Sequence, residues 1–446
     1  MDGMKCYEKH IAIARDHRLS QIHAAINAAL QANETPIRFA VVDSDSTTLH
    51  CEVGILQGAP TRSAEGIFAF QKRPFERSEK FTAMMMVPTG IAASVGGDAG
   101  DAQAAARLLA ASCDCLITHP NAVNGSDIME APPNALYVEG STFSRLIMGS
   151  IGLIPTRKNK ILLAVDGRAK KYQELVDLSI NSASAARLGL GANIDVVVVN
   201  PPLTTTATMV QSGRATGELK KFERLTNALD TYQTDYDAFA ISSVINTVHQ
   251  TILSYYRGET SVNPFGGAEA LMTHALSLLY NKPIAHSPMN PTIKLHLTYA
   301  WGVVEPPLAS EAISKTYLHC ILKGLHQSPR ILNQSAAWNV PGAISVADVN
   351  CLVQPDRCVG LPTLAALAQG IPVIAVNDET NIMKNDLEQL PWNPGQLLRS
   401  ANYIEAAGMV TALRAGISLD TVLRPIGKTR ILGSSPPTTH SSFIIR

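Results

Sequence analysis

Two histidines stand in polar or glycine-rich stretches where acid–base chemistry could take place. His119 lies in the run 118–124, THPNAVN, directly after a short apolar stretch, and His274 follows the glycine-rich segment 263–269, NPFGGAE. Imidazole is the side chain whose ordinary pKa lies nearest neutral pH, so it exchanges protons readily. We therefore take His119 and His274 as candidate catalytic residues, against the alternative of satisfied core or surface histidines.

Cys358 is the third candidate catalytic residue. It lies in the polar run 354–363, QPDRCVGLPT, before an expected helix, and a helix start could lower its pKa and make it a thiolate nucleophile. A small buried cysteine is the commoner alternative. The chain has seven cysteines, an odd and thinly spread number that suits reduced thiols, and Cys113 and Cys115 lack the spacing of a zinc knuckle. We expect no metal.

A glycine-rich turn at 87–100 predicts an anion site. Gly90, Gly96 and Gly97 follow an apolar strand and precede an alanine-rich helix. Glycines let a ligand approach the backbone, and free N–H groups at a helix start favour an anion. The spacing matches neither a dinucleotide fingerprint nor a Walker loop, so the cofactor stays unknown. A tight turn with a helix cap and no ligand is the alternative.

Further polar or glycine positions fall at expected strand ends and helix starts. Arg214, between two glycines, could bind a carboxylate or phosphate through both guanidinium nitrogens, or it could be a surface arginine. The other candidate ligand-binding residues are Thr89, Thr118, Asn121, Asn124, Gly266, Gly267, Glu269, Asp356 and Asn377.

The elements that position these residues read as repeated strand–turn–helix units. Residues 9–33 predict one long helix, and a strand follows at 37–45. Further strands are expected at 81–87, 115–118, 160–165, 194–200, 238–244, 343–346, 350–354 and 371–376, and further helices at 102–112, 169–188, 218–229, 267–280 and 362–369. Such alternation predicts an α/β protein with two or more Rossmann-like parallel-sheet domains and a ligand cleft between them.

The length of 446 residues exceeds what one core usually supports. We expect an N-terminal α/β domain carrying the glycine-rich turn at 1–150, a second α/β unit at 151–262, a C-terminal α/β domain at 263–425 and a Ser/Thr/Pro-rich tail at 426–446.

Composition limits the partners. Lys plus Arg and Asp plus Glu both number 37, so no net charge is available to attract nucleic acid. The apolar runs are strand-sized, far below the roughly 20 residues of a membrane span, and the N-terminus lacks the apolar centre of a signal peptide. We expect a cytoplasmic protein without a membrane or nucleic-acid partner, and a homo-oligomer stays open.

Several segments, in order, resemble a family of uncharacterised and mainly cyanobacterial proteins catalogued as domain of unknown function 3326. They are PTGIAASVGGDAGDA, LITHPNAVNGSDI, VVNPPL with SGRATGE, NPFGGAEAL with AHSPM, and LVQPDRCVGLPTLAALAQGIPVIAVNDETNIMKND. The resemblance covers about residues 80 to 425. It implies a cytosolic protein of a photosynthetic bacterium or its plastid relatives, and it brings no reaction.

Two other resemblances suggest chemistry. Residues 360–375 resemble the donor-binding half of two-domain glycosyltransferases, although Ala365 stands where those enzymes place a ribose-binding Glu. The architecture is similar to that of two-lobed racemases and decarboxylases. Our leading hypothesis is an isomerase- or lyase-type enzyme that acts on a small anionic metabolite, carrying a carboxylate or phosphate, by acid–base chemistry in an interdomain cleft. A glycosyltransferase-like group transferase and a non-catalytic metabolite-binding or assembly protein are the alternatives.

Overall fold

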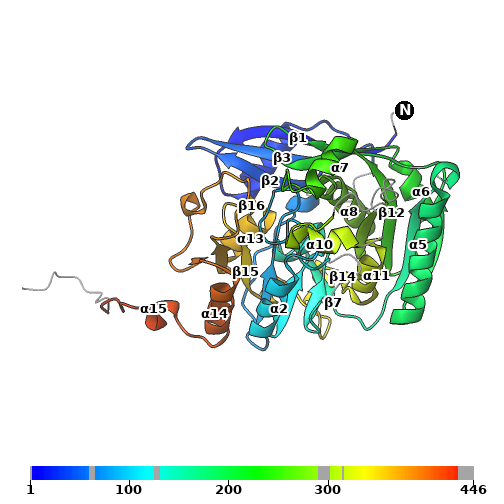
Figure 1. The fold of residues 1–446 in the computed structure, drawn as a ribbon. Coiled ribbons are helices and arrows are strands. Elements are labelled where there is room, and N and C mark those ends of the chain that lie inside the picture. Colours follow the sequence, from blue (N-terminus) through cyan, green and yellow to red (C-terminus); the bar gives the residue numbers. More distant parts are fainter. Residues whose placement is uncertain are drawn as a thin grey trace, which may run out of the picture.

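The computed structural model describes residues 3–59, 66–124, 131–167, 169–289, 302–313 and 316–429 of the chain. Its strands form two large sheets, one of six and one of ten strands, with helices packed around them (Figure 1). The expected mixture of helices and strands in one α/β fold is confirmed.

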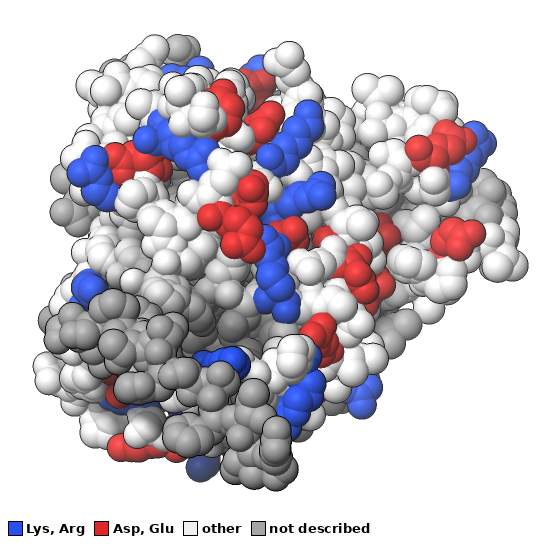
Figure 2. All heavy atoms as spheres, turned by 90° about the vertical axis from the view of Figure 1, so that its left-hand side faces the viewer, with Lys and Arg blue, Asp and Glu red and all other residues white. Residues whose placement is uncertain are grey.

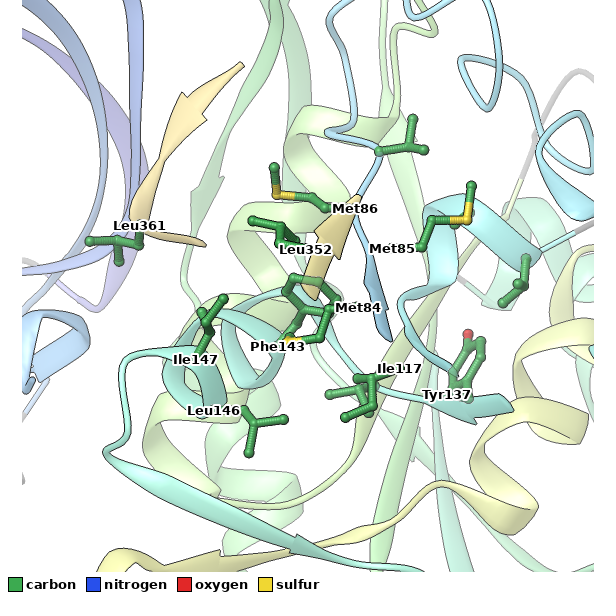
Figure 3. Close-up of a cluster of buried hydrophobic side chains, with 14 of the residues drawn as sticks. Met84, Met85, Met86, Ile117, Tyr137, Phe143, Leu146, Ile147, Leu352 and Leu361 are labelled. Atoms are coloured by element: carbon green, nitrogen blue, oxygen red, sulfur yellow. The ribbon is translucent and has the colours of Figure 1, made fainter. Parts of the chain in front are cut away.

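The six-stranded sheet is parallel throughout, in the order β18-β17-β15-β4-β5-β6. Every residue of β4, β15 and β17 is buried, as expected for strands covered on both faces. Figure 3 shows Met84 of β4, Leu352 of β15 and Phe143 of a neighbouring helix together in this core. The strands are β4 (Thr82–Met85), β5 (Cys115–Thr118), β6 (Ala135–Tyr137), β15 (Val349–Pro355), β17 (Val373–Val376) and β18 (Leu397–Ser400).

The ten-stranded sheet is mixed, so two or more Rossmann-like parallel-sheet domains are not confirmed. Its β16-β2-β3-β1-β11-β10 part is antiparallel, and β12 then pairs in parallel with β10, β8 and β13, while β9 extends β8. Its strands are β1 (Lys5–Ala14), β2 (Glu34–Ser44), β3 (Thr48–Gln57), β8 (Lys160–Asp166), β9 (Asn193–Val199), β10 (Thr204–Met209), β11 (Ala215–Lys220), β12 (Ala238–Asn246), β13 (Ile284–Met289) and β16 (Val359–Gly360). A two-stranded sheet joins β7 (Ile151–Ile154) to β14 (Arg330–Asn333).

The long helix predicted at 9–33 is wrong. Residues 5–14 form β1, and only α1 (Leu19–Ala28) is helical. Within β1, Ile11 and Ile13 are buried while Ala12 and Ala14 are exposed, a period of two, and β1 pairs with β3 along all ten of its residues. Tertiary pairing therefore outweighs the helical propensity of this segment.

Two shorter predictions are also corrected. The helix expected at 218–229 begins only at Glu223, because residues 215–220 form β11 between β1 and β10. The strand expected at 343–346 is a single bridge between Leu153 and Ile344, followed by a 3-10 turn, η2 (Val346–Asp348).

The helices cover both sheets. Figure 1 shows α5 at the right beside β12, with α2 and α14 at the lower left. The helices beyond α1 are α2 (Gln103–Ser112), α3 (Pro120–Val123), α4 (Gly140–Ile147), α5 (Ala169–Leu190), α6 (Glu223–Asp230), α7 (His249–Tyr256), α8 (Gly266–Tyr280), α10 (Pro306–Ile313), α11 (Leu318–Gln327), α12 (Gln334–Ala337), α13 (Leu361–Gln369), α14 (Tyr403–Arg414) and α15 (Leu419–Val422). Two further 3-10 turns are η1 (Gly66–Phe68) and η3 (Leu387–Gln389).

The chain order of the sheets bears on the domain boundaries, which stay predictions. The parallel sheet takes strands from residues 82–137 and again from 349–400, on either side of much of the mixed sheet. Most of the expected tail, residues 430–446, lies outside the described residues.

The surface shows no large patch of one charge sign on the face drawn in Figure 2, where Lys and Arg are interspersed with Asp and Glu. Among the described residues, no helix combines the length and the apolar character that crossing a membrane requires.

Helix α8 joins the two sheets through unusually close backbone contacts. A Cβ on Gly267 would clash with the carbonyl oxygen of Ala215, and a Cβ on Gly266 would clash with the hydroxyl of Thr89. On the facing strand β11, a Cβ on Gly217 would lie 2.5 Å from the Cβ of Ala268. The glycines expected to cradle a ligand at 266 and 267 therefore let the first turn of α8 touch β11 and the glycine-rich turn.

Replacing Gly267 with alanine should lower the free energy of unfolding by about 2 to 3 kcal/mol, because the new methyl group meets backbone that cannot rotate away. Gly408→Ala is the matched control, since Gly408 lies in α14 with open space around it, and it should be neutral or stabilising by up to about 1 kcal/mol. Urea unfolding measures both. Equal stability of the two variants would contradict the packing role of Gly267.

Candidate functional site

A cavity of about 260 Å³ lies at the carboxyl ends of the parallel strands. Met86, His119, Glu139 and Cys358 follow β4, β5, β6 and β15 in the chain, and all four line it. Ligands of open α/β sheets bind at this edge. The opposite wall comes from β2, the first turns of α8 and strand β13 of the mixed sheet.

Most residues proposed from the sequence meet in this one cavity. It is lined by His119, His274, Cys358, Thr89, Gly97, Asn121, Asn124, Arg214, Gly266 and Glu269. The others do not line it: Gly90, Gly96, Thr118, Gly267, Asp356 and Asn377.

The residues outside the cavity have structural contacts of their own. Thr118 donates to the carbonyl of Met85 at 3.2 Å, and Gly90 packs against Ala215. Asp356 and Asn377 both accept from Arg399, away from the cavity at the ends of β15 and β17. These contacts explain the presence of these four residues without requiring that they bind a ligand.

His119 is a neutral hydrogen-bond donor in this structure. The backbone N–H of Val87 donates to its Nε2 at 2.9 Å, so Nε2 carries no proton and the ring proton lies on Nδ1. Burial lowers the pKa of His119 to about 4. Because His119 lines the cavity, its Nδ1–H is available to a bound molecule. A histidine of this kind polarises an oxygen better than it removes a proton.

His274 lies beside the buried carboxylate of Glu139. Its Nδ1 lies 3.3 Å from the carbonyl oxygen of Ile37 and therefore carries a proton, while Nε2 lies 3.4 Å from Oε1 of Glu139. Burial alone would raise the pKa of Glu139, but the nearby His274 and donors from Ser141 outweigh it and hold that pKa below its usual value. Burial also lowers the pKa of His274, although the charge of Glu139 opposes this shift. The pair is thus a carboxylate beside a neutral imidazole at the cavity wall.

Glu139 and Gly140 fix the position of this pair. Glu139 is the N-cap of α4 and accepts from the backbone N–H groups of Ser141 and Thr142, each at 3.0 Å. A Cβ on Gly140 would lie 2.9 Å from Nε2 of His274, so glycine at this position leaves room for the imidazole. The sequence reasoning missed Glu139, although an acid after a short strand and before Gly-Ser-Thr is a helix N-cap signal.

Two helix starts face the cavity without a capping side chain. These are the first residues of α8, at Gly266, and of α13, at Leu361, helices of 15 and 9 residues. Their free N–H groups and the positive end of the helix dipole favour an anion. The arrangement suits the anionic ligand expected from the sequence. Of the glycines predicted to bind it, only Gly266 stands at one of these two helix starts.

Arg214 binds carboxylates, but these belong to the chain itself. Its Nη2 lies 2.6 Å from Glu8, its Nε contacts Glu52, and Arg38 lies 3.4 Å from the other oxygen of Glu8. Gly54 on β3 separates Arg38 and Glu8 in the sheet, and its missing side chain lets them meet. The four buried charges balance, so Arg214 has little charge left for an anion. The sequence could not show this, because β1 was expected to be a helix.

Glu311, on α10, is a buried carboxyl that the sequence did not reveal. Its Oε1 accepts from the N–H of Ala99 at 2.9 Å, from Tyr255 at 3.0 Å and from Asn263 at 3.2 Å. Burial raises its pKa to about 7, and the charge of Asp98 adds to the rise. No periodicity or motif around position 311 signals such a residue.

Cys358 does not have the surroundings of a thiolate. Burial raises the pKa of its thiol well above the ordinary value, and the charges of Glu379 and Asp356 raise it further. All seven cysteines are free thiols. Nucleophilic catalysis by Cys358 stays a prediction that this environment disfavours. Among the described residues no three His, Cys, Asp or Glu side chains are grouped so that they could hold a metal ion.

Comparison with known proteins gives a family and one named relative. The model of the family described as protein of unknown function DUF3326 matches residues 82–423. An uncharacterised lipoprotein of a Synechococcus strain is 32% identical over 340 residues, which cover 75% of this chain and 91% of the relative. No solved structure matches.

The cytoplasmic location expected from the sequence is contradicted by this comparison. The Synechococcus relative is named as a lipoprotein, which is not the class of protein that the N-terminal residues led us to expect. The location expected from composition and from the N-terminus is therefore withdrawn.

The buried neutral His119 should make stability depend on pH. Its pKa is about 4 in the folded chain and about 6.5 unfolded, so between these values the unfolded chain binds a proton that the folded chain does not. Stability is therefore lost as the pH falls. From about pH 7.5 to 5.5 this histidine should cost about 1 kcal/mol.

Urea unfolding of His119→Gln at both pH values measures this term, because glutamine can still accept the Val87 N–H and does not titrate. The wild type should lose about 1 kcal/mol more than this variant, whereas exposed His17→Gln should behave like the wild type. The same pH dependence in all three proteins would show that His119 is not buried in its neutral form.

Proposed function

The chain belongs to the DUF3326 family, and from the geometry of its cavity we propose that it is an enzyme of the isomerase or lyase type. It acts by proton transfer on a small metabolite that carries a carboxylate or phosphate. The observation that carries this proposal is the His274–Glu139 pair, an imidazole 3.4 Å from a carboxylate at the wall of a cavity at the carboxyl ends of parallel strands.

The pair supplies the acid and base of the reaction. Nε2 of neutral His274 removes a proton from the substrate carbon next to a carboxyl or carbonyl group, the nearby carboxylate of Glu139 stabilises the imidazolium that forms, and the C–H electron pair becomes part of an enolate. Return of that proton from His274 to a neighbouring atom completes an isomerisation. Departure of a group from the adjacent carbon instead completes an elimination.

His119 and the helix starts stabilise the charge that develops. The Nδ1–H of His119 is a fixed donor in a buried site, where a hydrogen bond to an oxyanion is stronger than in water. The free N–H groups at Gly266 and Leu361 suit the anionic end of the substrate. Because His119 is already neutral with its proton on Nδ1, it can donate a hydrogen bond to the oxyanion without a change in protonation.

The size of the cavity favours a small metabolite over a nucleotide sugar. Its volume of about 260 Å³ lies below the roughly 300 Å³ at which pockets for drug-sized ligands begin. Ala365, at the position where the resemblance places a ribose-binding acid, is fully buried in α13. Both observations support proton-transfer chemistry over the glycosyltransferase alternative.

Proton removal next to a carboxylate should be visible as exchange with solvent. We would incubate the protein in D₂O with small 2-hydroxy, 2-oxo and 2-amino acids and phosphorylated acids, and follow deuterium at carbon by proton NMR. At least one class should incorporate deuterium, and His274→Gln should slow it by about 100-fold or more, the usual contribution of a positioned acid–base group.

The exposed His17→Gln serves as the matched control and should exchange at the wild-type rate. His119→Gln should slow exchange less than His274→Gln, since it alters a donor and leaves the base in place. If acids bind in the cavity but none of any class incorporates deuterium, the proposal is overturned and a binding protein is supported instead.

A further inference from the structure

Two glutamates of the cavity have no part in this proton transfer. Glu269 lies on the first turn of α8 with its side chain 27% exposed, and Glu311 on α10 is 2% exposed. Both line the cavity. They lie close enough that the charge of Glu269 contributes to raising the pKa of Glu311.

Neither glutamate is paired with a cation in the part of the chain that the structure describes. The two arginines that line the cavity, Arg38 and Arg214, pair with Glu8 and Glu52 in the mixed sheet. All three hydrogen bonds of Glu311 reach Oε1, so its Oε2 has no donor among the described residues. A buried carboxylate without a counter-charge is costly unless a ligand supplies that charge.

His286 provides an independent sign that something is missing here. Its Nε2 lies 2.9 Å from the hydroxyl of Ser243, and its side chain is 1% exposed. The other nitrogen, Nδ1, is buried and has no hydrogen-bond partner among the described residues. With the ring proton on Nε2, the lone pair of Nδ1 faces the carboxylate of Glu269 and needs a donor between the two.

The separation of His286 and Glu269 fits a single nitrogen donor, and Glu311 lines the same cavity. Nδ1 of His286 and Oε1 of Glu269 lie 3.5 Å apart. One nitrogen can lie about 2.9 Å from both atoms, the usual hydrogen-bond distance. The side chains of Tyr256, Phe265 and Tyr317 also line the cavity, and aromatic rings attract cations.

We infer that Glu269, Glu311 and His286 bind an ammonium group, so that the substrate is a small amino acid with its carboxylate at the helix starts. This inference rests on the proposed function and narrows its substrate class. An ammonium has three N–H donors, which match one oxygen of each glutamate and Nδ1 of His286. A hydroxyl or a keto oxygen at the same position brings no positive charge to two carboxylates.

Matched acids that differ only at carbon 2 test the inference directly. We would measure affinities by calorimetry for three series: alanine, lactate and pyruvate; glutamate, 2-hydroxyglutarate and 2-oxoglutarate; and phenylalanine, phenyllactate and phenylpyruvate. In the series that binds, the amino acid should bind at least about 10-fold tighter than its hydroxy and keto partners, the effect of about one charged hydrogen bond.

Variants of the two glutamates test whether these residues cause the preference for the amino acid. Glu269→Gln and Glu311→Gln keep the shape of the side chain and should each reduce the preference for the amino acid by about 10-fold. Glu259→Gln, whose side chain is 51% exposed, is the control and should leave it unchanged. The preference of the wild type is a separate readout, so a variant that fails to fold does not remove the test.

The outcomes separate the two proposals. If hydroxy or keto acids bind as tightly as the amino acid, or if the preference survives both glutamate variants, the ammonium site is wrong while proton transfer on another acid stands. If an amino acid binds with the expected preference and never exchanges deuterium, the ammonium site stands and the enzyme proposal fails. Binding of no acid in any series contradicts both.

Discussion

The close contact between the first turn of α8 and strand β11 is the constraint on which the cavity depends. Gly217, Gly266 and Gly267 remove three side chains from one small region, and the backbone of α8 comes against Ala215 and Thr89 as a result. Thr89 belongs to the turn after β4 of the parallel sheet, and Ala215 begins β11 of the mixed sheet. One helix start is therefore held by both sheets, and the space left beside it is the cavity.

The buried charges of the protein fall into two groups with different consequences. In the mixed sheet, two arginines and two glutamates neutralise one another. Burying these charges costs desolvation free energy, which the attraction between the paired charges offsets. In the cavity, Glu269 and Glu311 have no arginine or lysine partner among the described residues, and burial raises the pKa of Glu311 to about 7. An arrangement of this second kind weakens a fold and is typical of sites that bind or transform ligands.

The sequence predicted the parallel sheet better than the mixed one, for a physical reason. Strands such as 115–118 and 350–354 are buried on both faces and appear as short apolar runs between turns. Strand β1 alternates polar and apolar residues weakly, and the helix was predicted from small and apolar residues at 11, 13, 14, 22, 24, 25 and 28. The partners of Arg214 lie on β1 and β3, so that error also hid the charge network.

The candidate histidines were identified from their position in the sequence, without knowledge of their geometry. His119 and His274 were chosen because each follows a strand or a glycine turn, and both do line one cavity. Their protonation could not be read in the same way, because it is set by distant backbone groups: the N–H of Val87 for His119 and the carbonyl of Ile37 for His274. The local sequence predicts which turn or strand end carries a residue, whereas the hydrogen-bond partners of its side chain depend on the whole fold.

Gly140 shows how tightly the acid–base pair is built into the fold. Because a Cβ at this position would lie 2.9 Å from Nε2 of His274, the first residue of α4 must be small for the imidazole to reach Glu139. Glu139 in turn caps the same helix, so its carboxylate is already held by N–H groups before it meets the histidine. The helix cap orients the acid, the glycine admits the base, and the close packing of α8 against β11 brings that base to the cavity. The close approach of His274 to Glu139 is therefore a consequence of backbone geometry, and a substitution at any of these positions would alter the pair without touching a ligand.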